Sequence, residues 1–329
     1  MQSELLYQAP RQGMGCWAIG GPFFAGESSL GWGKVDDAES VRAVHAAYDA
    51  GIRIFDTAAV YGAGHSEHIL GQALANKSEC LVITKAGLAF DEQSKQVVGE
   101  DTNAANILPA IDASLRRLQR DTIDVLLLHL NELPIAQAEP LFAAMELARE
   151  QGKIRAYGWS TDYPGNVDAF ATQAGFQAVE HAMNLFVDVP TIQKTIEEHD
   201  LTPLIRSPLA MGVLTGKYTQ ATRFPSDDNR SRDEAWKDYF VDCGVAPIYL
   251  QQLDSIKECL SVGGRSLAQG ALGWLMAKSE RNIPLPGART AAQVIENAAA
   301  LEFGPLPANA MAEIETLIQR TPEGEARSR

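Results

Sequence analysis

The chain has 329 residues, 46% hydrophobic and 21% charged, enough to bury a substantial core in one large α/β barrel or in two ordinary domains. Its net charge of −14 opposes binding to nucleic acid phosphates, although a small anion could still bind a local basic pocket. No apolar stretch approaches the length of about 20 residues that a membrane helix needs. The opening MQSELLYQAPRQG lacks the basic and then apolar order of a signal peptide, so we expect a cytoplasmic protein.

Histidines and cysteines give little indication of a metal site. The four cysteines lie far apart without CxxC spacing, which favours free thiols; they are Cys16, Cys80, Cys243 and Cys259. His65 and His68 lie three residues apart at the start of a helix-like segment, a spacing that could bring both to one metal ion. Because no third ligand is evident nearby, we interpret them as surface histidines and predict no metal site.

In chain order, short apolar runs alternate with amphipathic segments. The first half contains the predicted strands MGCWAIG, IRIFDT, CLVITKAG and IDVLLLHL. Between the first two, Val41, Val44 and Tyr48 lie on one face of a helix that Asp36 or Asp37 could cap. Before the fourth, an apolar stripe predicts another helix; its members are Ile107, Leu108, Ile111, Leu115 and Leu118.

The second half continues the same rhythm. Its predicted strands are IRAYGWST, AVEHAMN, TPLIRSPL and NIPLPGA, and its predicted helices span 137–151, 164–173, 190–199, 266–279, 290–299 and 308–319. Eight strands with intervening helices predict a (β/α)8 barrel as a single domain over residues 1–329, with a doubly wound sheet as the main alternative. We interpret the polar segment at about 218–250 as a surface excursion or an active-site loop.

Polar residues close several of the predicted strands. Asp56 ends the second strand, Lys85 the third and His129 the fourth, and in a (β/α)8 barrel these positions share the C-terminal rim where active sites form. Tyr61 lies on the loop that follows Asp56. An acid, a phenol, an amine and an imidazole at one rim suit proton transfer to a carbonyl oxygen, because an ammonium lowers the cost of a phenolate and a carboxylate keeps the amine charged. The alternative is that each residue simply meets solvent.

In these segments the sequence resembles the aldo-keto reductase family. FDTAAVYGAGHSEHILGQAL is similar to its Asp-x4-Tyr-Gly signature, and VITKAG and IDVLLLHL are similar to its lysine and histidine strands. The likeness continues through GWS, SPLAMGVLTGK and PGARTAAQVIEN, over nearly the whole chain. It implies that Tyr61 is a general acid tuned by Lys85 and Asp56, with His129 orienting the substrate.

The resemblance also implies a nicotinamide cofactor, since no side chain can donate a hydride. No GxGxxG fingerprint is present, which argues against a Rossmann domain. Carried over by position, the cofactor residues are Ser160 for the carboxamide, Ser207, Leu209, Gly212 and Lys217 for the pyrophosphate, and Gly287, Arg289, Gln293 and Asn297 for the adenosine end. Arg289 favours a 2′-phosphate and hence NADP(H), because guanidinium pairs bidentately with phosphate; its alternative role is a solvated loop arginine.

Three positions depart from the family pattern. Thr161 replaces a common asparagine or arginine, Glu180 replaces a common glutamine, and Arg206 replaces the aromatic residue that usually stacks under nicotinamide. Because two opposite charges replace neutral residues on adjacent strands, we hypothesise that Arg206 stacks through its guanidinium while Glu180 neutralises it.

The loop after the first strand, GGPFFAGESSLGWG, fits no standard phosphate loop, so we assign Phe23, Phe24 and Trp32 to a substrate wall. Trp17 is a candidate cofactor contact or a core tryptophan. Asn131, Asp162 and Trp236 add polar groups, which favours a small hydroxylated or sugar-type carbonyl substrate. We therefore predict an NADP-dependent aldehyde or ketone reductase. The alternatives are a regulatory subunit that binds nicotinamide on the same barrel, and a barrel lyase or isomerase without redox cofactor.

Overall fold

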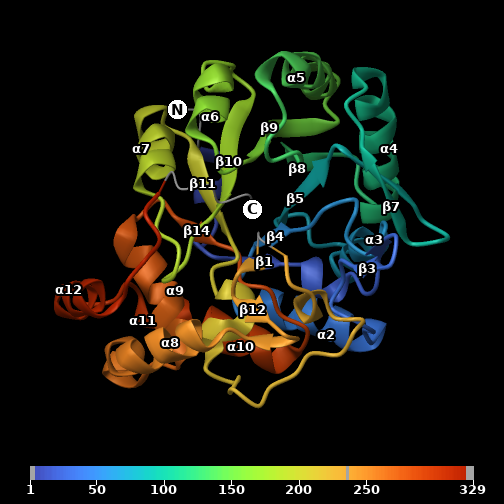
Figure 1. Cartoon of the computed structure of the whole chain (residues 1–329). Coiled ribbons are helices and arrows are strands. Elements are labelled where there is room, and N and C mark those ends of the chain that lie inside the picture. The colour runs from blue at the N-terminus through green and yellow to red at the C-terminus, as the bar shows by residue number, and fades with distance from the viewer. Residues whose placement is uncertain (1–3, 235–236, 324–329) are drawn as a thin grey trace.

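Eight parallel strands form the central sheet of the computed structural model, which describes residues 4–234 and 237–323 (Figure 1). In spatial order they are β1 (Gly13–Gly15), β4 (Ile54–Asp56), β5 (Leu81–Ala86), β8 (Ile123–Leu128), β9 (Ile154–Ser160), β10 (Phe176–Ala182), β11 (Thr202–Arg206) and β14 (Ile283–Pro284). All eight predicted strands are present, so the prediction of a (β/α)8 barrel is confirmed and the doubly wound alternative is wrong.

The barrel closes between its first and last strands. Gly15 forms a parallel bridge with Gly287, and the Gly15 amide donates to the Pro286 carbonyl at 3.1 Å. A Cβ atom at Gly15 would lie 2.8 Å from the Leu285 carbonyl oxygen, so only glycine permits this close approach of two backbones.

Helices surround the barrel (Figure 1). They are α1 (Glu4–Tyr7), α2 (Asp37–Asp49), α3 (His65–Ala73), α4 (Ile107–Leu118), α5 (Ile135–Glu150), α6 (Pro164–Phe170), α7 (Pro190–Glu198), α8 (Pro247–Leu260), α9 (Leu267–Lys278), α10 (Ala291–Ala298), α11 (Ala300–Phe303) and α12 (Ala308–Leu317). Asp36 caps α2 by accepting from the amides of Ala38 and Glu39, as one of the two predicted caps. None of the described helices has the length and apolar character needed to cross a membrane.

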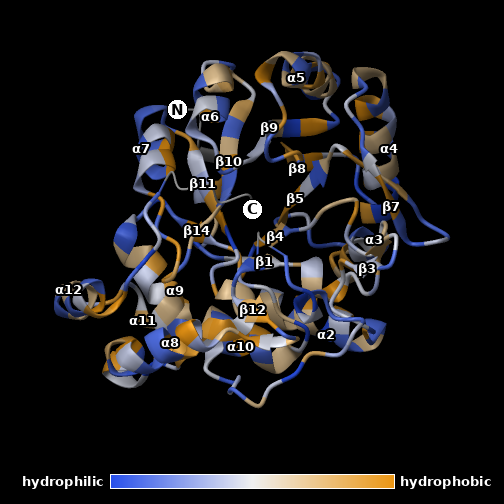
Figure 2. Ribbon diagram, viewed as in Figure 1, coloured by the Kyte–Doolittle hydropathy of each residue, from blue (hydrophilic) through white to orange (hydrophobic). Residues whose placement is uncertain are grey.

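The barrel interior is apolar at one end. A buried cluster fills it, to which every strand except β1 contributes at least one inward side chain. Its strand members are Ile54, Leu81, Ile83, Val125, Leu127, Ala156, Ala178, Leu204 and Ile283, and Leu6 of α1 and Leu285, just after β14, belong to the same cluster. The hydropathy view shows hydrophobic and hydrophilic residues mixed along the surrounding helices (Figure 2). With α1 closing this end, the opposite end is the one open to ligands.

Two hairpins at the open end were missed by the sequence analysis. β2 (Phe24–Ala25) and β3 (Ser28–Ser29) lie in the loop after β1, and β6 (Leu88–Asp91) and β7 (Gln96–Glu100) lie in the loop after β5. They join into a separate four-stranded sheet in the order β3-β2-β7-β6. Their strands are short and largely exposed or half-buried, so the apolar pattern that reveals a core strand is absent.

The polar segment at about 218–250 is irregular over most of its described part. It contains a 3-10 turn at Asn229–Ser231 and the short hairpin of β12 (Phe240–Val241) and β13 (Gly244–Val245). Its predicted end is too late, because Pro247 already opens α8, a helix that the sequence analysis did not predict.

Candidate active site

The side chains at the open end follow from the period of two along a strand. Ile54, Ile83, Ala178 and Leu204 belong to the inward-facing apolar cluster. Two residues further along the same strands come Asp56, Lys85, Glu180 and Arg206, which therefore point into the barrel mouth. The inward side chains of these four strands thus change from apolar to charged toward the open end of the barrel.

Lys85 lies at the centre of this mouth and is 1% exposed. Its Nζ donates to Asp56 Oδ1 at 2.6 Å and to the Thr57 carbonyl at 2.9 Å. The same Nζ lies 3.1 Å from Oε2 of Glu180, whose Oε1 accepts from the Ser160 hydroxyl at 3.1 Å. Two carboxyl groups and one ammonium therefore form a single buried cluster.

Tyr61 and His129 lie beside that cluster. The Tyr61 ring centroid is 5.3 Å from Lys85 Nζ and 5.8 Å from the His129 ring, which it meets edge to face. Trp17 stacks on the other side of Tyr61 at 5.8 Å. Within the described part of the chain the Tyr61 hydroxyl has no hydrogen-bond partner, and it lines a pocket, so it is available to a ligand.

The surroundings set the ionisation of the basic groups. Burial disfavours the ammonium form of Lys85, but the carboxyl groups of Asp56 and Glu180 outweigh it and raise its pKa, which keeps the amine charged. Burial, together with the positive charges of Lys85 and Arg206, lowers the pKa of His129 to about 3. His129 is consequently a neutral imidazole at neutral pH.

The predicted effect of Lys85 on Tyr61 is present, but burial outweighs it. Lys85 does lower the pKa of the phenol, but burial acts more strongly, and Asp56 and Glu180 act with it, so the pKa of Tyr61 is raised. The proton therefore stays on the hydroxyl until a basic oxygen arrives to take it.

The predicted pairing of Glu180 with Arg206 is wrong. Glu180 pairs with Lys85, whereas Arg206 hydrogen-bonds Asp162, a residue that the sequence analysis assigned only to the polar pocket. Asp162 also accepts from the Ala182 amide at 2.8 Å, which anchors the loop after β9 to β10. Arg206 still lines the pocket, as expected. Only the carboxylate predicted to pair with it was wrong.

One pocket of about 730 Å³ contains most of the predicted site residues. It is lined by the predicted catalytic Asp56, Tyr61 and His129, by the predicted cofactor residues Trp17, Ser160, Glu180, Arg206, Ser207, Leu209, Gly212, Lys217, Gly287, Arg289, Gln293 and Asn297, and by Phe23, Trp32 and Asn131. Lys85 is not part of the pocket wall and lies behind it.

The loop after β11 has an unusual backbone on the pocket wall. Ser207, Ala210, Met211 and Gly212 all have positive φ, with values of 53°, 47°, 52° and 97°. Three of these residues, Ala210 to Gly212, are successive, and the amides of Ala210 and Gly212 donate within the loop, to the Ser207 and Leu209 carbonyls. The loop therefore brings its backbone against the pocket at Ser207, Met211 and Gly212.

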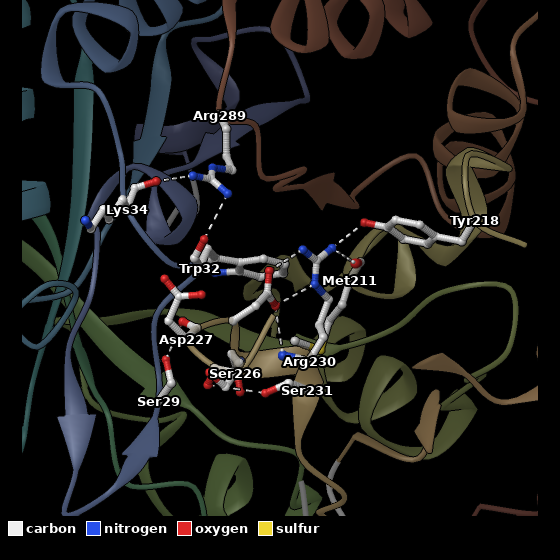
Figure 3. A network of polar contacts seen from close by, with 12 residues as sticks. Ser29, Trp32, Lys34, Met211, Tyr218, Ser226, Asp227, Arg230, Ser231 and Arg289 are labelled. Atoms are coloured by element: carbon white, nitrogen blue, oxygen red, sulfur yellow. Dashed lines mark hydrogen bonds and ion pairs between the residues drawn. The ribbon is translucent and has the colours of Figure 1, made fainter. Parts of the chain in front are cut away.

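Arg289 lies at the far end of the pocket and is already engaged. Its guanidinium donates to the carbonyls of Trp32 and Lys34, and its own amide donates to Gln293 Oε1 at 2.8 Å (Figure 3). The loop after β1 is therefore tied to the loop after β14 across the mouth of the pocket.

Arg230 is a pocket residue that the sequence analysis missed. It pairs with Asp228 at 2.6 Å, hydrogen-bonds Tyr218 and the Met211 carbonyl, and its guanidinium lies 4.7 Å from the Trp32 ring centroid (Figure 3). It thus links the excursion to the loops after β1 and β11. An arginine inside the polar stretch SDDNRSRDE carries no sequence signal that separates it from solvated neighbours.

The predicted substrate residues divide into three groups. Phe23 and Trp32 lie on an apolar wall with Leu30, Val60 and Leu88. Asn131 orients the loop after β9, since its Oδ1 accepts from the Asp162 amide and its carbonyl accepts from Thr161 and Asn166. Trp236 lies outside the described residues.

The remaining metal and thiol expectations concern side chains that do not line this pocket. His65 hydrogen-bonds Asp37 at 2.9 Å, and no cluster of metal-binding side chains is found among residues 4–234 and 237–323. The four cysteines are free.

Comparison with known proteins agrees with this geometry. The model of the Aldo/keto reductase family matches residues 14–319. Aldo-keto reductase YhdN of Bacillus subtilis is 30% identical over 95% of this chain and 91% of its own length, and an NADH-specific methylglyoxal reductase of Escherichia coli is 29% identical over 94% and 96%. A rice protein named "Probable voltage-gated potassium channel subunit beta" is 28% identical over 88% and 90%. Among solved structures, a glycerol dehydrogenase from Gluconobacter oxydans superposes with a TM-score of 0.76 at 34% identity, covering 93% of this chain and 90% of that one.

The chain belongs to the aldo/keto reductase family, a family of oxidoreductases on the (β/α)8 barrel.

Proposed function

We propose that this protein is an NADP(H)-dependent reductase that interconverts a small aldehyde or ketone with its alcohol. The observation that carries the proposal is the Tyr61 hydroxyl, which is protonated, without a hydrogen-bond partner among the described residues, and placed in the pocket between neutral His129 and the buried Lys85. Such a hydroxyl suits a general acid for a carbonyl oxygen.

A nicotinamide cofactor bound in the pocket would supply a hydride to the carbonyl carbon. As negative charge develops on the carbonyl oxygen, Tyr61 gives it the phenolic proton, so one hydride and one proton together complete the alcohol. His129, being neutral, can donate one ring N–H to the same oxygen and orient it. Lys85 remains charged behind Tyr61 and stabilises the phenolate that proton transfer leaves.

The nicotinamide end of the cofactor would be surrounded by Ser160, Glu180 and Arg206. Its phosphates would be bordered by Ser207, Leu209, Gly212 and Lys217. The adenosine end of the cofactor would be held by Gly287, Arg289, Gln293 and Asn297. Arg289 supports NADP(H) because its guanidinium suits a 2′-phosphate, although it must then exchange at least one carbonyl of the loop after β1 for the ligand.

The names of two relatives support a short substrate, since methylglyoxal and glycerol are both three-carbon molecules. The apolar wall of Phe23, Leu30, Val60 and Leu88 suits the carbon end of such a molecule, while the carbonyl oxygen meets Tyr61 and His129. A sugar-type or other hydroxylated carbonyl remains part of this proposal.

A screen of NADPH oxidation against three-carbon, sugar-derived, aliphatic and aromatic aldehydes tests the function. We expect carbonyl-dependent oxidation of NADPH that is lost in Tyr61→Phe. Tight NADPH binding without turnover on any carbonyl would contradict the proposal and favour a regulatory subunit, the role named for the rice relative. Failure to bind NADPH and NADH would favour a lyase or isomerase.

A further inference from the structure

An excess of carboxyl groups surrounds the buried Lys85. Asp56 is 5% exposed, Glu180 2% and Lys85 1%, so water cannot compensate their charges. Asp56 and Glu180 approach the same Nζ at 2.6 and 3.1 Å, so two buried carboxyl groups meet at one ammonium. Two carboxyl groups can hydrogen-bond each other only if one of them is protonated.

Glu180 has an unsatisfied oxygen when both groups are ionised. Its Oε2 lies near Lys85 but is not aligned for a hydrogen bond, and this buried atom has no hydrogen-bond partner in the described chain. A buried carboxylate oxygen without a partner is costly, and each such atom in a folded protein needs an explanation. One proton between Asp56 and Glu180 would supply the missing partner.

The charges around Lys85 also favour one bound proton. Arg206 is paired with Asp162, so it does not compensate the second carboxyl group beside Lys85. The other titratable groups around Glu180 are neutral, since burial lowers the pKa values of His129 and His181 and raises those of Tyr61 and Cys16. With both carboxyl groups ionised, Lys85 would face two buried negative charges; one bound proton leaves it paired with one.

We propose that Asp56 and Glu180 share one proton beside Lys85 in the free protein, and that Glu180 is a positioning residue that makes the acidity of Tyr61 depend on this proton. Burial and the neighbouring Glu180 carboxyl raise the pKa of Asp56 well above its ordinary value.

The shared proton controls how well Tyr61 acts as an acid. While the proton is held, Lys85 faces a single negative charge and can stabilise a phenolate. When the pair loses the proton at higher pH, the second carboxylate opposes phenolate formation, and carbonyl reduction slows. This consequence rests on the proposed function, whereas the shared proton itself is a property of the free protein.

Difference infrared spectroscopy of the free protein against Glu180→Gln tests the proton directly. At neutral pH we expect a carboxylic acid C=O band in the wild type that is absent from Glu180→Gln. The control is Glu146→Gln on α5, whose partly exposed carboxylate pairs with Arg149, and it should keep the band. A wild type without the band, or a band that survives in Glu180→Gln, overturns the proposal. Carbon-13 NMR of the carboxyl groups in the wild type alone gives the same answer if Glu180→Gln does not fold.

The pH profile of carbonyl reduction tests the link to Tyr61. We expect the wild type to lose kcat at alkaline pH in a step that is absent from Glu180→Gln, at least until the phenol itself ionises. An unchanged step in the variant would refute the positioning role. Absence of any reductase activity would refute only the proposed function, because the infrared measurement uses neither cofactor nor substrate.

Discussion

Tyr61 is the residue whose chemistry is most constrained by its position. Its ring is held between Trp17 and His129, and its hydroxyl faces the pocket rather than a protein acceptor. The fixed ring means that removing the hydroxyl changes the chemistry with little change of shape.

For Tyr61→Phe we expect NADPH binding to persist while turnover falls by a factor of about 10² or more, because the general acid is lost. Steady-state kinetics and a fluorescence titration with NADPH measure the two effects. Tyr157→Phe is the matched control, since its hydroxyl binds Gln173 away from the pocket and its loss should leave turnover intact. Equal activity in Tyr61→Phe would remove Tyr61 from this role.

Arg289 carries the proposed cofactor preference. For Arg289→Ala we expect weaker NADPH binding with NADH binding little changed, because only NADPH has a 2′-phosphate. Titrations with both cofactors measure this. Arg232→Ala is the control, since Arg232 also ties down the loop after β1, through Ser28 and Glu27, but does not line the pocket. A parallel loss for both cofactors would show that Arg289 acts by holding the loop.

The charged residues of the mouth show what a sequence can predict at this scale. Asp56, Lys85 and His129 could be placed together because each ends an apolar strand of a parallel barrel. The partners of Glu180 and Arg206 could not, because strand order allows several pairings and only side-chain geometry selects Lys85 for one and Asp162 for the other.

At the scale of elements, a buried ion pair joins two helices and a strand behind the active site. Arg117 of α4 donates to Glu67 of α3 at 2.6 Å, and Thr84 of β5 donates to the other Glu67 oxygen at 2.6 Å. Glu67 is fully buried, so its charge depends on Arg117. These contacts help to fix β5, the strand that carries Lys85.

We expect Arg117→Met to lower the free energy of unfolding by about 3–5 kcal/mol, because it leaves a buried carboxylate without its cation. Urea denaturation followed by circular dichroism measures the change. Arg42→Met breaks the exposed pair with Glu39 on α2 and should leave stability near the wild-type value. Equal stability of the two variants would mean that Glu67 is protonated or solvated in the folded chain.

The elements differ in how readily the sequence reveals them. The barrel strands are buried on both sides, so they appear as apolar runs, and the main helices have apolar stripes. The hairpin β6–β7 is short and half-buried or exposed, so it lacks the pattern of a core strand. The buried face of α8 does have helical spacing, but the sequence analysis missed it behind the long polar segment; its members are Leu253, Ile256, Cys259 and Leu260. The hairpin, which brings Leu88 and Val97 to the pocket wall, is therefore predicted less well than the barrel strands.

At the scale of the whole molecule, stability should depend on pH through histidines that the fold keeps neutral. Burial lowers the pKa of His181 to about 4, and His181 has no exposed surface. An unfolded chain has an ordinary histidine pKa of about 6.5. Between these two values the unfolded state binds a proton that the folded state does not, so acid favours unfolding.

The sign and window of the effect follow from these values. Above about pH 6.5 neither state is protonated and the stability is constant; it falls as the pH drops toward 4 and then changes no further through this group. For the wild type we expect His181 to contribute a loss of about 1–2 kcal/mol between about pH 7 and pH 5. His181→Asn should lower stability at every pH but lose less over this interval. Urea denaturation of both proteins at the two pH values measures the difference, and parallel losses would show that His181 is protonated in the folded chain.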